Sequence, residues 1–232
     1  DMGTITFSGH GGDTVMSGFD DMMPTAYEEV FALTKNKSDA ATGAGNLTVA
    51  GQTANNTWRY DSPSVGGAQF SVAYISADTG TTAGRISSYS DMGIKISPEA
   101  VEGLTIGFAT GEYDKSATTL GLDHSTMFAT YAYGSMTVGY QSSEIDGPTA
   151  AASDESTSWA VSYAVSDDFS VSYGQHEYEQ GTNANAQESS GFSASYTMGG
   201  TSIKAAFNST DNIRTTASND EDSFEIAISF AF

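Results

Sequence analysis

The sequence predicts an all-β fold, an antiparallel β-barrel whose strands cross a membrane, and three observations support this. Apolar and polar residues alternate along most of the chain, and the last eleven residues alternate without a break. No stretch reaches the roughly 18 consecutive apolar residues that a membrane-spanning helix needs. Because successive side chains of a strand point to opposite faces, each alternating segment has one apolar face and one polar face.

The C-terminal segment, residues 222–232, shows the pattern most clearly. A soluble sheet would bury such an apolar face under a second protein layer, whereas lipid can cover it directly. Transmembrane barrels use this arrangement, with about ten residues per strand. The apolar face of the segment consists of Phe224, Ile226, Ile228, Phe230 and Phe232.

The same alternation predicts about twelve strands. Short turns rich in Gly, Pro or Asp join hairpin partners, and longer polar links such as 146–155 and 179–188 join one hairpin to the next. Barrels of bacterial outer membranes show this asymmetry between short periplasmic turns and longer outer loops. The predicted strands are residues 2–8, 57–61, 69–76, 88–96, 104–108, 125–133, 136–140, 159–165, 169–173, 192–198, 203–207 and 222–232.

The alternation stops between residues 9 and 56. This segment is Gly-rich at its start and acidic in its middle, and it is aperiodic except at residues 47–50. A connection of this length in a compact domain is usually functional. Its acidic residues include Asp13, Asp20, Asp21, Glu28 and Glu29.

Composition narrows the class of protein. The chain has 29 Asp and Glu residues against 8 Lys and Arg, a formal charge of −21 that repels nucleic acid and attracts cations. It has no Cys, which excludes disulfides and Cys-based metal sites. No export signal is visible at Asp1, so we expect that a preceding segment has been removed or lies outside the sequence.

Three sequence features resemble the general porins of Gram-negative bacteria, most closely those of alphaproteobacteria. They are the strand Met2-Gly3-Thr4-Ile5-Thr6-Phe7 before an acidic loop, the run Trp58-Arg59-Tyr60-Asp61-Ser62-Pro63, and the terminal Phe232. The resemblance covers the whole chain and implies a single barrel domain over residues 1–232. Porins have about sixteen strands, and the long loop after the fifth strand folds inward to narrow the pore. We therefore expect strands 5 to 16 of such a barrel here, with residues 9–56 as the constriction loop.

The resemblance also implies a function without catalysis. We expect an outer-membrane homotrimer, in contact with membrane lipids and lipopolysaccharide, that lets small hydrophilic solutes and ions diffuse through a water-filled pore. In this family, acidic residues of the constriction loop face basic residues of the barrel wall. The acids of residues 9–56 would then face Arg59, the first basic candidate, with Lys95 and Lys204 as further candidates. The large acidic excess predicts a preference for cations.

A metal site is a further hypothesis. Asp20, Asp21, Glu28 and Glu29 offer the oxygen ligands that Ca²⁺ takes, and acidic loops of the family can bind this ion. Their spacing does not match an EF-hand loop. No cofactor is required for the expected function.

Three alternatives stay open from the sequence. The chain could be a complete barrel of twelve strands, either a substrate-specific channel or an outer-membrane phospholipase, or a secreted Ca²⁺-binding adhesin or surface-layer protein. A phospholipase needs Ser and His on the lipid side, but His124 and His176 share the parity of the inward Ser and Thr residues. Ala194 and Ala205 would suit contact between barrels, although lipid accepts Ala equally well.

Overall fold

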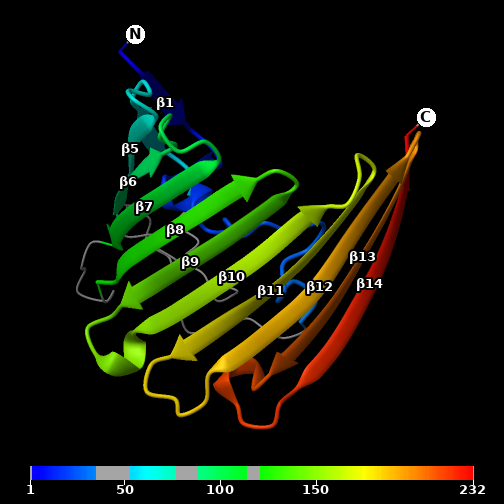
Figure 1. Ribbon diagram of the computed structural model, residues 1–232. Coiled ribbons are helices and arrows are strands. Elements are labelled where there is room, and N and C mark those ends of the chain that lie inside the picture. Colours follow the sequence, from blue (N-terminus) through cyan, green and yellow to red (C-terminus); the bar gives the residue numbers. More distant parts are fainter. Residues whose placement is uncertain (1, 35–52, 77–87, 114–120, 232) are drawn as a thin grey trace. The chain divides into compact units, whose positions relative to one another are not determined.

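Twelve strands form one sheet whose order follows the chain, from β1 at one edge to β14 at the other (Figure 1). The computed structural model describes residues 2–34, 53–76, 88–113 and 121–231. The antiparallel all-β fold and the twelve predicted strands are confirmed. The strands are β1 (Thr4–Ser8), β4 (Thr57–Asp61), β5 (Ala68–Ile75), β6 (Tyr89–Ile96), β7 (Leu104–Tyr113), β8 (Asp123–Tyr133), β9 (Met136–Asp146), β10 (Asp154–Ala164), β11 (Phe169–Gln180), β12 (Gln187–Met198), β13 (Thr201–Asp211) and β14 (Glu221–Phe230).

Several strands run beyond the predicted segments. β9 ends at Asp146 and β11 at Gln180, whereas the alternation of large apolar residues ends at Tyr140 and Tyr173. The added residues are mostly polar. Lipid contact produces the apolar alternation, but backbone hydrogen bonding continues where the strand leaves the lipid, so the sequence pattern underestimates strand length.

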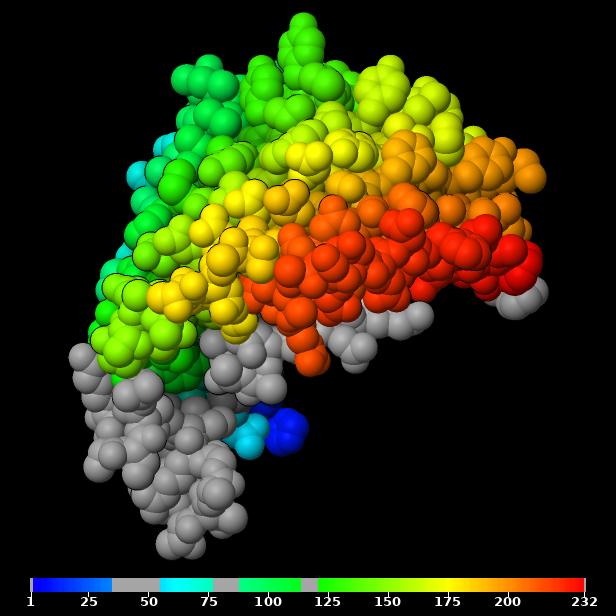
Figure 2. Space-filling view, turned by 90° about the horizontal axis from the view of Figure 1, so that it is seen from below, coloured from blue at the N-terminus to red at the C-terminus, as the bar shows by residue number. Residues whose placement is uncertain are grey.

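The sheet exposes apolar side chains and buries polar ones, the reverse of a soluble protein. Trp58 and Phe192, for example, are 51% and 50% exposed, whereas Thr126, Ser193 and Thr210 are at most 3% exposed. In the space-filling view, β13 and β14 lie side by side as the orange and red part of the surface (Figure 2). The exposure of apolar side chains and the burial of polar ones agree with the predicted apolar outer face and with the predicted small, polar inner face, which is here called the polar face.

Contacts divide the chain into two compact units. The first consists of Asp1–Asp21, Thr48–Phe128 and Ser143–Asp154, and the second of Met22–Leu47, Ala129–Ser142 and Glu155–Phe232. In the first unit, Ile75 and Tyr89 are buried and pack with Tyr113. In the second unit, the buried apolar residues include Ala160, Tyr178 and Ala206.

The aperiodic segment contains short elements that the sequence did not predict. β2 (Gly12–Asp13) pairs with β3 (Thr53–Ala54), and a 3-10 turn, η1 (Met16–Gly18), follows β2. Two-residue strands are too short to show alternation. Residues 47–50 lie outside the described residues, as do two parts of polar stretches that the sequence predicts to link one hairpin to the next: the whole of 78–85, and residues 114–120 of the stretch 114–123.

The remaining connections are short turns and two further 3-10 turns, η2 (Ala150–Ala152) and η3 (Ile213–Thr215). Gly134 and Gly199 have φ of +59° and +60° in the turns after β8 and β12, a conformation that Gly adopts without steric cost. Among the described residues, no helix has the length and apolar character needed to cross a membrane. The numbering of the strands within a larger barrel stays a prediction.

Candidate functional site

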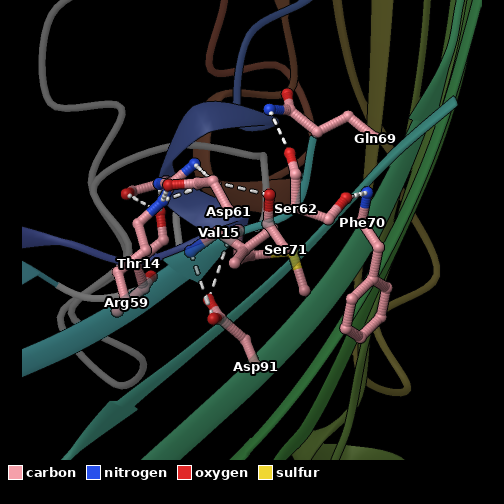
Figure 3. A network of polar contacts seen from close by, with 11 residues as sticks. Thr14, Val15, Arg59, Asp61, Ser62, Gln69, Phe70, Ser71 and Asp91 are labelled. Carbon is pink, nitrogen blue, oxygen red and sulfur yellow. Dashed lines mark hydrogen bonds and ion pairs between the residues drawn. The ribbon is translucent and has the colours of Figure 1, made fainter. Parts of the chain in front are cut away.

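In the first unit, two charged side chains of the sheet hold the backbone of the chain after β2 (Figure 3). The Asp91 carboxylate on β6 accepts hydrogen bonds from Val15 N at 3.1 Å and Met16 N at 2.8 Å. Arg59 Nη1 on β4 donates to Thr14 O at 2.9 Å. Residues 14–21, here called the first loop stretch, are thus fastened to the sheet by bonds to ionised groups, which are the stronger class of hydrogen bond.

Arg59 also forms an ion pair on its own strand (Figure 3). Its Nη2 lies 3.0 Å from Asp61 Oδ1, and Ser71 Oγ donates to the same oxygen at 2.6 Å. The side chains of Arg59 and Asp61 are 29% and 24% exposed. Arg59 therefore presents its charge together with that of Asp61, a partner that the sequence analysis did not assign.

Apolar contacts accompany these bonds. Val15 and Met16 are fully buried, and the Phe19 ring meets Phe128 edge-on with centroids 5.3 Å apart. A Cβ atom on Gly93 of β6 would lie 2.9 Å from Val15 Cγ1. The absence of a side chain at Gly93 thus leaves the space that Val15 fills.

In the second unit, neutral side chains of β9, β11, β12 and β13 bond the backbone of residues 22–34, here called the second loop stretch. Thr34 adds a bond between side chains, with its Oγ1 2.7 Å from Thr210 Oγ1. Each bond is a neutral one, worth about 1 kcal/mol net. The backbone bonds are Met22 N to Gln141 Oε1 (3.1 Å), Ala26 N to Ser172 Oγ (3.0 Å), Tyr27 N to Ser193 Oγ (3.1 Å) and Asn208 Nδ2 to Glu29 O (2.8 Å).

Glycines on the polar face make room for the second loop stretch. A Cβ atom on Gly139 would lie 2.5 Å from Pro24 Cδ, closer than real Cβ contacts allow. Cβ atoms on Gly174 and Gly191 would each lie 3.2 Å from side-chain atoms of Val30. The close approach of Pro24 therefore requires glycine at position 139, whereas at positions 174 and 191 the tightest contacts of a Cβ atom would be with Trp159 O (2.8 Å) and Phe207 O (3.0 Å) of the neighbouring strands.

Tyr27 connects the second loop stretch to two charged residues of the sheet. Its hydroxyl donates to Glu225 Oε1 on β14, and Lys204 Nζ on β13 lies 5.2 Å from the centroid of its ring. The hydrogen bond to the Glu225 carboxylate raises the pKa of Tyr27 from 10.0 to about 12. Tyr27 therefore stays neutral at physiological pH.

The predicted site residues occupy different environments. Asp13 and Asp21 are exposed, while Asp20 is half-buried, and Glu28 and Glu29 are half-buried in the second loop stretch. Lys95 is exposed on β6. The structure brings Arg59 against the first loop stretch and Lys204 against the second. Their role in a constriction stays a prediction.

The two sheet histidines are buried within aromatic contacts. His124 lies 5.2 Å from Tyr113 between ring centroids, and His176 lies 4.6 Å from Phe31. The two side chains are 7% and 2% exposed.

Calcium binding by Asp20, Asp21, Glu28 and Glu29 also stays a prediction. In residues 2–34, 53–76, 88–113 and 121–231, no group of three or more His, Cys, Asp or Glu side chains is placed to hold a metal ion. Since Ca²⁺ takes six to eight oxygen ligands, the described side chains by themselves do not form such a site.

Sequence reasoning did not assign a functional role to Asp61, Asp91, Tyr27 or Glu225. A signal was present for the acids, because they take inward positions on strands whose other inward residues are mostly small or uncharged. A carboxylate there needs a partner. Nothing in the sequence marks Tyr27, which lies in an aperiodic segment.

Comparison with known proteins supplies the family. The chain is similar to an anion-selective porin from Comamonas acidovorans (TM-score 0.67, 15% identity, 100% of this chain and 75% of that chain). It is similar to a porin refined at 1.8 Å (TM-score 0.66, 13% identity, 100% and 78%) and to OmpT, an outer membrane protein of Vibrio cholerae (TM-score 0.64, 12% identity, 99% and 76%). No curated protein sequence matches the chain. The family model of Gram-negative porins matches residues 1–212, so this chain, with its porin fold, belongs to the Gram-negative porins and is a channel protein of the bacterial outer membrane.

Proposed function

We propose that the chain lines a water-filled pore through which small hydrophilic solutes and ions diffuse passively, and that its first and second loop stretches narrow this pore. One observation carries the proposal: a twelve-stranded sheet exposes apolar side chains, while in each unit its polar side chains bond a loop stretch of residues 14–34. The loop and the sheet together would then limit the width of the solutes that pass, and the charged residues that they present would bias which charges pass. A channel is favoured over the phospholipase and adhesin alternatives because the family is one of porins.

We further propose that the pore prefers cations. The formal charge of −21 supports this, and the Arg59 charge is offset by Asp61. Asp13, Asp20, Asp21, Glu28 and Glu29 would face Arg59, Lys95 and Lys204 across the narrowest part. The anion selectivity named for the Comamonas porin is a property of that protein.

Reversal potentials in planar bilayers test both parts of the proposal. In a KCl gradient, we expect stable conductance steps and a reversal potential with the sign of K⁺ preference. Conductance with a reversal potential of the opposite sign would contradict only the cation preference. A refolded protein that inserts into bilayers without conductance would contradict the channel itself.

Arg59→Ala tests the assigned basic residue, with Arg214→Ala as the matched control. Arg59 bonds the first loop stretch, whereas Arg214 is an exposed residue of η3. Removing the guanidinium leaves Asp61 without its ion pair, so we expect a stronger cation preference and a changed conductance. Unchanged selectivity and conductance in Arg59→Ala, equal to those of Arg214→Ala, would exclude Arg59 from the constriction.

We propose a homotrimer in contact with outer-membrane lipids and lipopolysaccharide. OmpT of Vibrio cholerae has been solved in a trimer form. Ala194 and Ala205 are directly paired in the register of β12 and β13 and offer a small, apolar contact. Native mass measurement of the detergent-solubilised protein tests this proposal, and a mass of one chain would contradict it.

A further inference from the structure

Tyr27 of the second loop stretch lies against three strands of the polar face. Its backbone N–H donates to Ser193 Oγ on β12, its ring faces Lys204 on β13, and its hydroxyl donates to Glu225 on β14. The backbone bond fixes the position of the residue, and few side-chain rotamers then satisfy both the ring contact and the hydroxyl bond. The ring is therefore held in one place between a basic and an acidic residue.

Lys204 and Glu225 are close enough in the sheet to form an ion pair. Lys204 pairs with Ala227 in the register of β13 and β14, and Ala206 pairs with Glu225, so Lys204 and Glu225 are diagonal neighbours on one face. Such neighbours are about 7–8 Å apart, which long side chains can span. Within the described residues, however, no ion pair joins them, and each contacts Tyr27 instead.

Tyr27 offers each charged group an alternative partner. The electron-rich face of the ring attracts the Lys204 ammonium, and the hydroxyl satisfies one lone pair of the Glu225 carboxylate. Because the pKa of Tyr27 is raised to about 12, the ring acts as a neutral spacer. Lys204 and Glu225 thus keep opposite charges on the two sides of one aromatic ring.

We propose that Tyr27 is a positioning residue that holds Lys204 and Glu225 apart, so that the pore favours zwitterionic solutes over uncharged solutes of the same size. Two separated opposite charges produce a local field that orients a dipolar solute, whereas a closed ion pair largely cancels its own field. This inference rests on the proposed channel function, since it concerns the solutes that such a channel selects.

The test measures the flux of the amino acid glycine relative to that of glycerol into liposomes that contain the protein. In Tyr27→Ala, Lys204 and Glu225 can close into an ion pair, so the flux ratio should fall to the value of Lys204→Met. Tyr27→Phe keeps the ring and should retain most of the ratio. Glu225→Gln removes one of the charges without removing the spacer and should also lower the ratio.

A double variant separates positioning from simple loss of loop packing. In the Lys204→Met background, Tyr27→Ala should change the ratio no further. Phe31→Ala is the matched control, because it removes a ring of the second loop stretch that contacts His176 rather than the two charges. An unchanged ratio in both Tyr27→Ala and Glu225→Gln, an additive double variant, or an equal fall in Phe31→Ala would overturn the inference. If the native protein passes neither solute, the channel proposal itself fails.

Discussion

The first and second loop stretches are fastened to the polar face by different chemistry. In the first unit, the Asp91 carboxylate accepts hydrogen bonds from two backbone N–H groups, and the Arg59 guanidinium donates a hydrogen bond to one backbone carbonyl. In the second unit, the backbone bonds come from the amides of Gln141 and Asn208 and from two serine hydroxyls. Ionised groups form stronger bonds and cost more when their partners are removed. We infer that the first stretch depends on few residues and the second on many.

The largest effect is expected for Asp91→Ala. The change leaves the N–H groups of Val15 and Met16 buried without their acceptor, which should lower the free energy of unfolding by about 3 kcal/mol. Urea unfolding in detergent micelles measures it. Asp123→Ala, at an exposed position of β8, is the matched control and should cost little. Equal losses for the two variants would show that Asp91 does not hold the first loop stretch.

Gly139→Val should have the next largest effect. The new side chain would meet Pro24 and Met23, so the second loop stretch must move, and overpacking of this kind costs about 1–3 kcal/mol. We expect lower stability in urea and an altered single-channel conductance. Gly18→Val is the control, because a Cβ atom at Gly18 meets no atom within 4 Å. Native conductance in Gly139→Val would show that the loop does not depend on this position.

The strands were predictable and the fastening of the loop was not, for a physical reason. Lipid demands an apolar side chain at every second position, as in Phe224 and Ile226, and this periodic demand is visible in sequence. The bonds of Asp91 and Ser193 reach residues far away in the chain and follow no period. The alternation of side chains along the strand predicts that Asp91 lies on the inner face, but only the folded chain shows what it binds there.

Single neutral anchors should matter less than Asp91. Ser172→Ala removes the acceptor of Ala26 N and a 2.7 Å bond with Ser193, so the free energy of unfolding should fall by about 1 kcal/mol. Ser195→Ala is the control. Ser195 is the next inward residue after Ser193 on β12, and among the described residues its side chain contacts Ser170 and not the loop. A loss in Ser172→Ala as large as that in Asp91→Ala would refute the contrast between the two stretches.

The smallest effect should appear at high pH. Tyr27 has its pKa raised from 10.0 to about 12, so its bond with Glu225 stabilises the protein below pH 10 and is lost as the pH rises toward 12. We expect solute flux to change in this window. Tyr27→Phe, which has no phenol to ionise at this position, is the reference. The same change in Tyr27→Phe would assign it to other groups.

Gly139 means that the sheet is shaped to one particular loop, because a side chain at this position would occupy the place of Pro24. If the second loop stretch narrows the pore as proposed, the width of the pore depends both on the loop and on the sheet position against which it lies. Grafting a bulkier loop from another porin would therefore need a second step, in which the sheet residues beneath the loop are changed to match it. A graft made without that step would sit further from the wall and leave a narrower passage than its donor has.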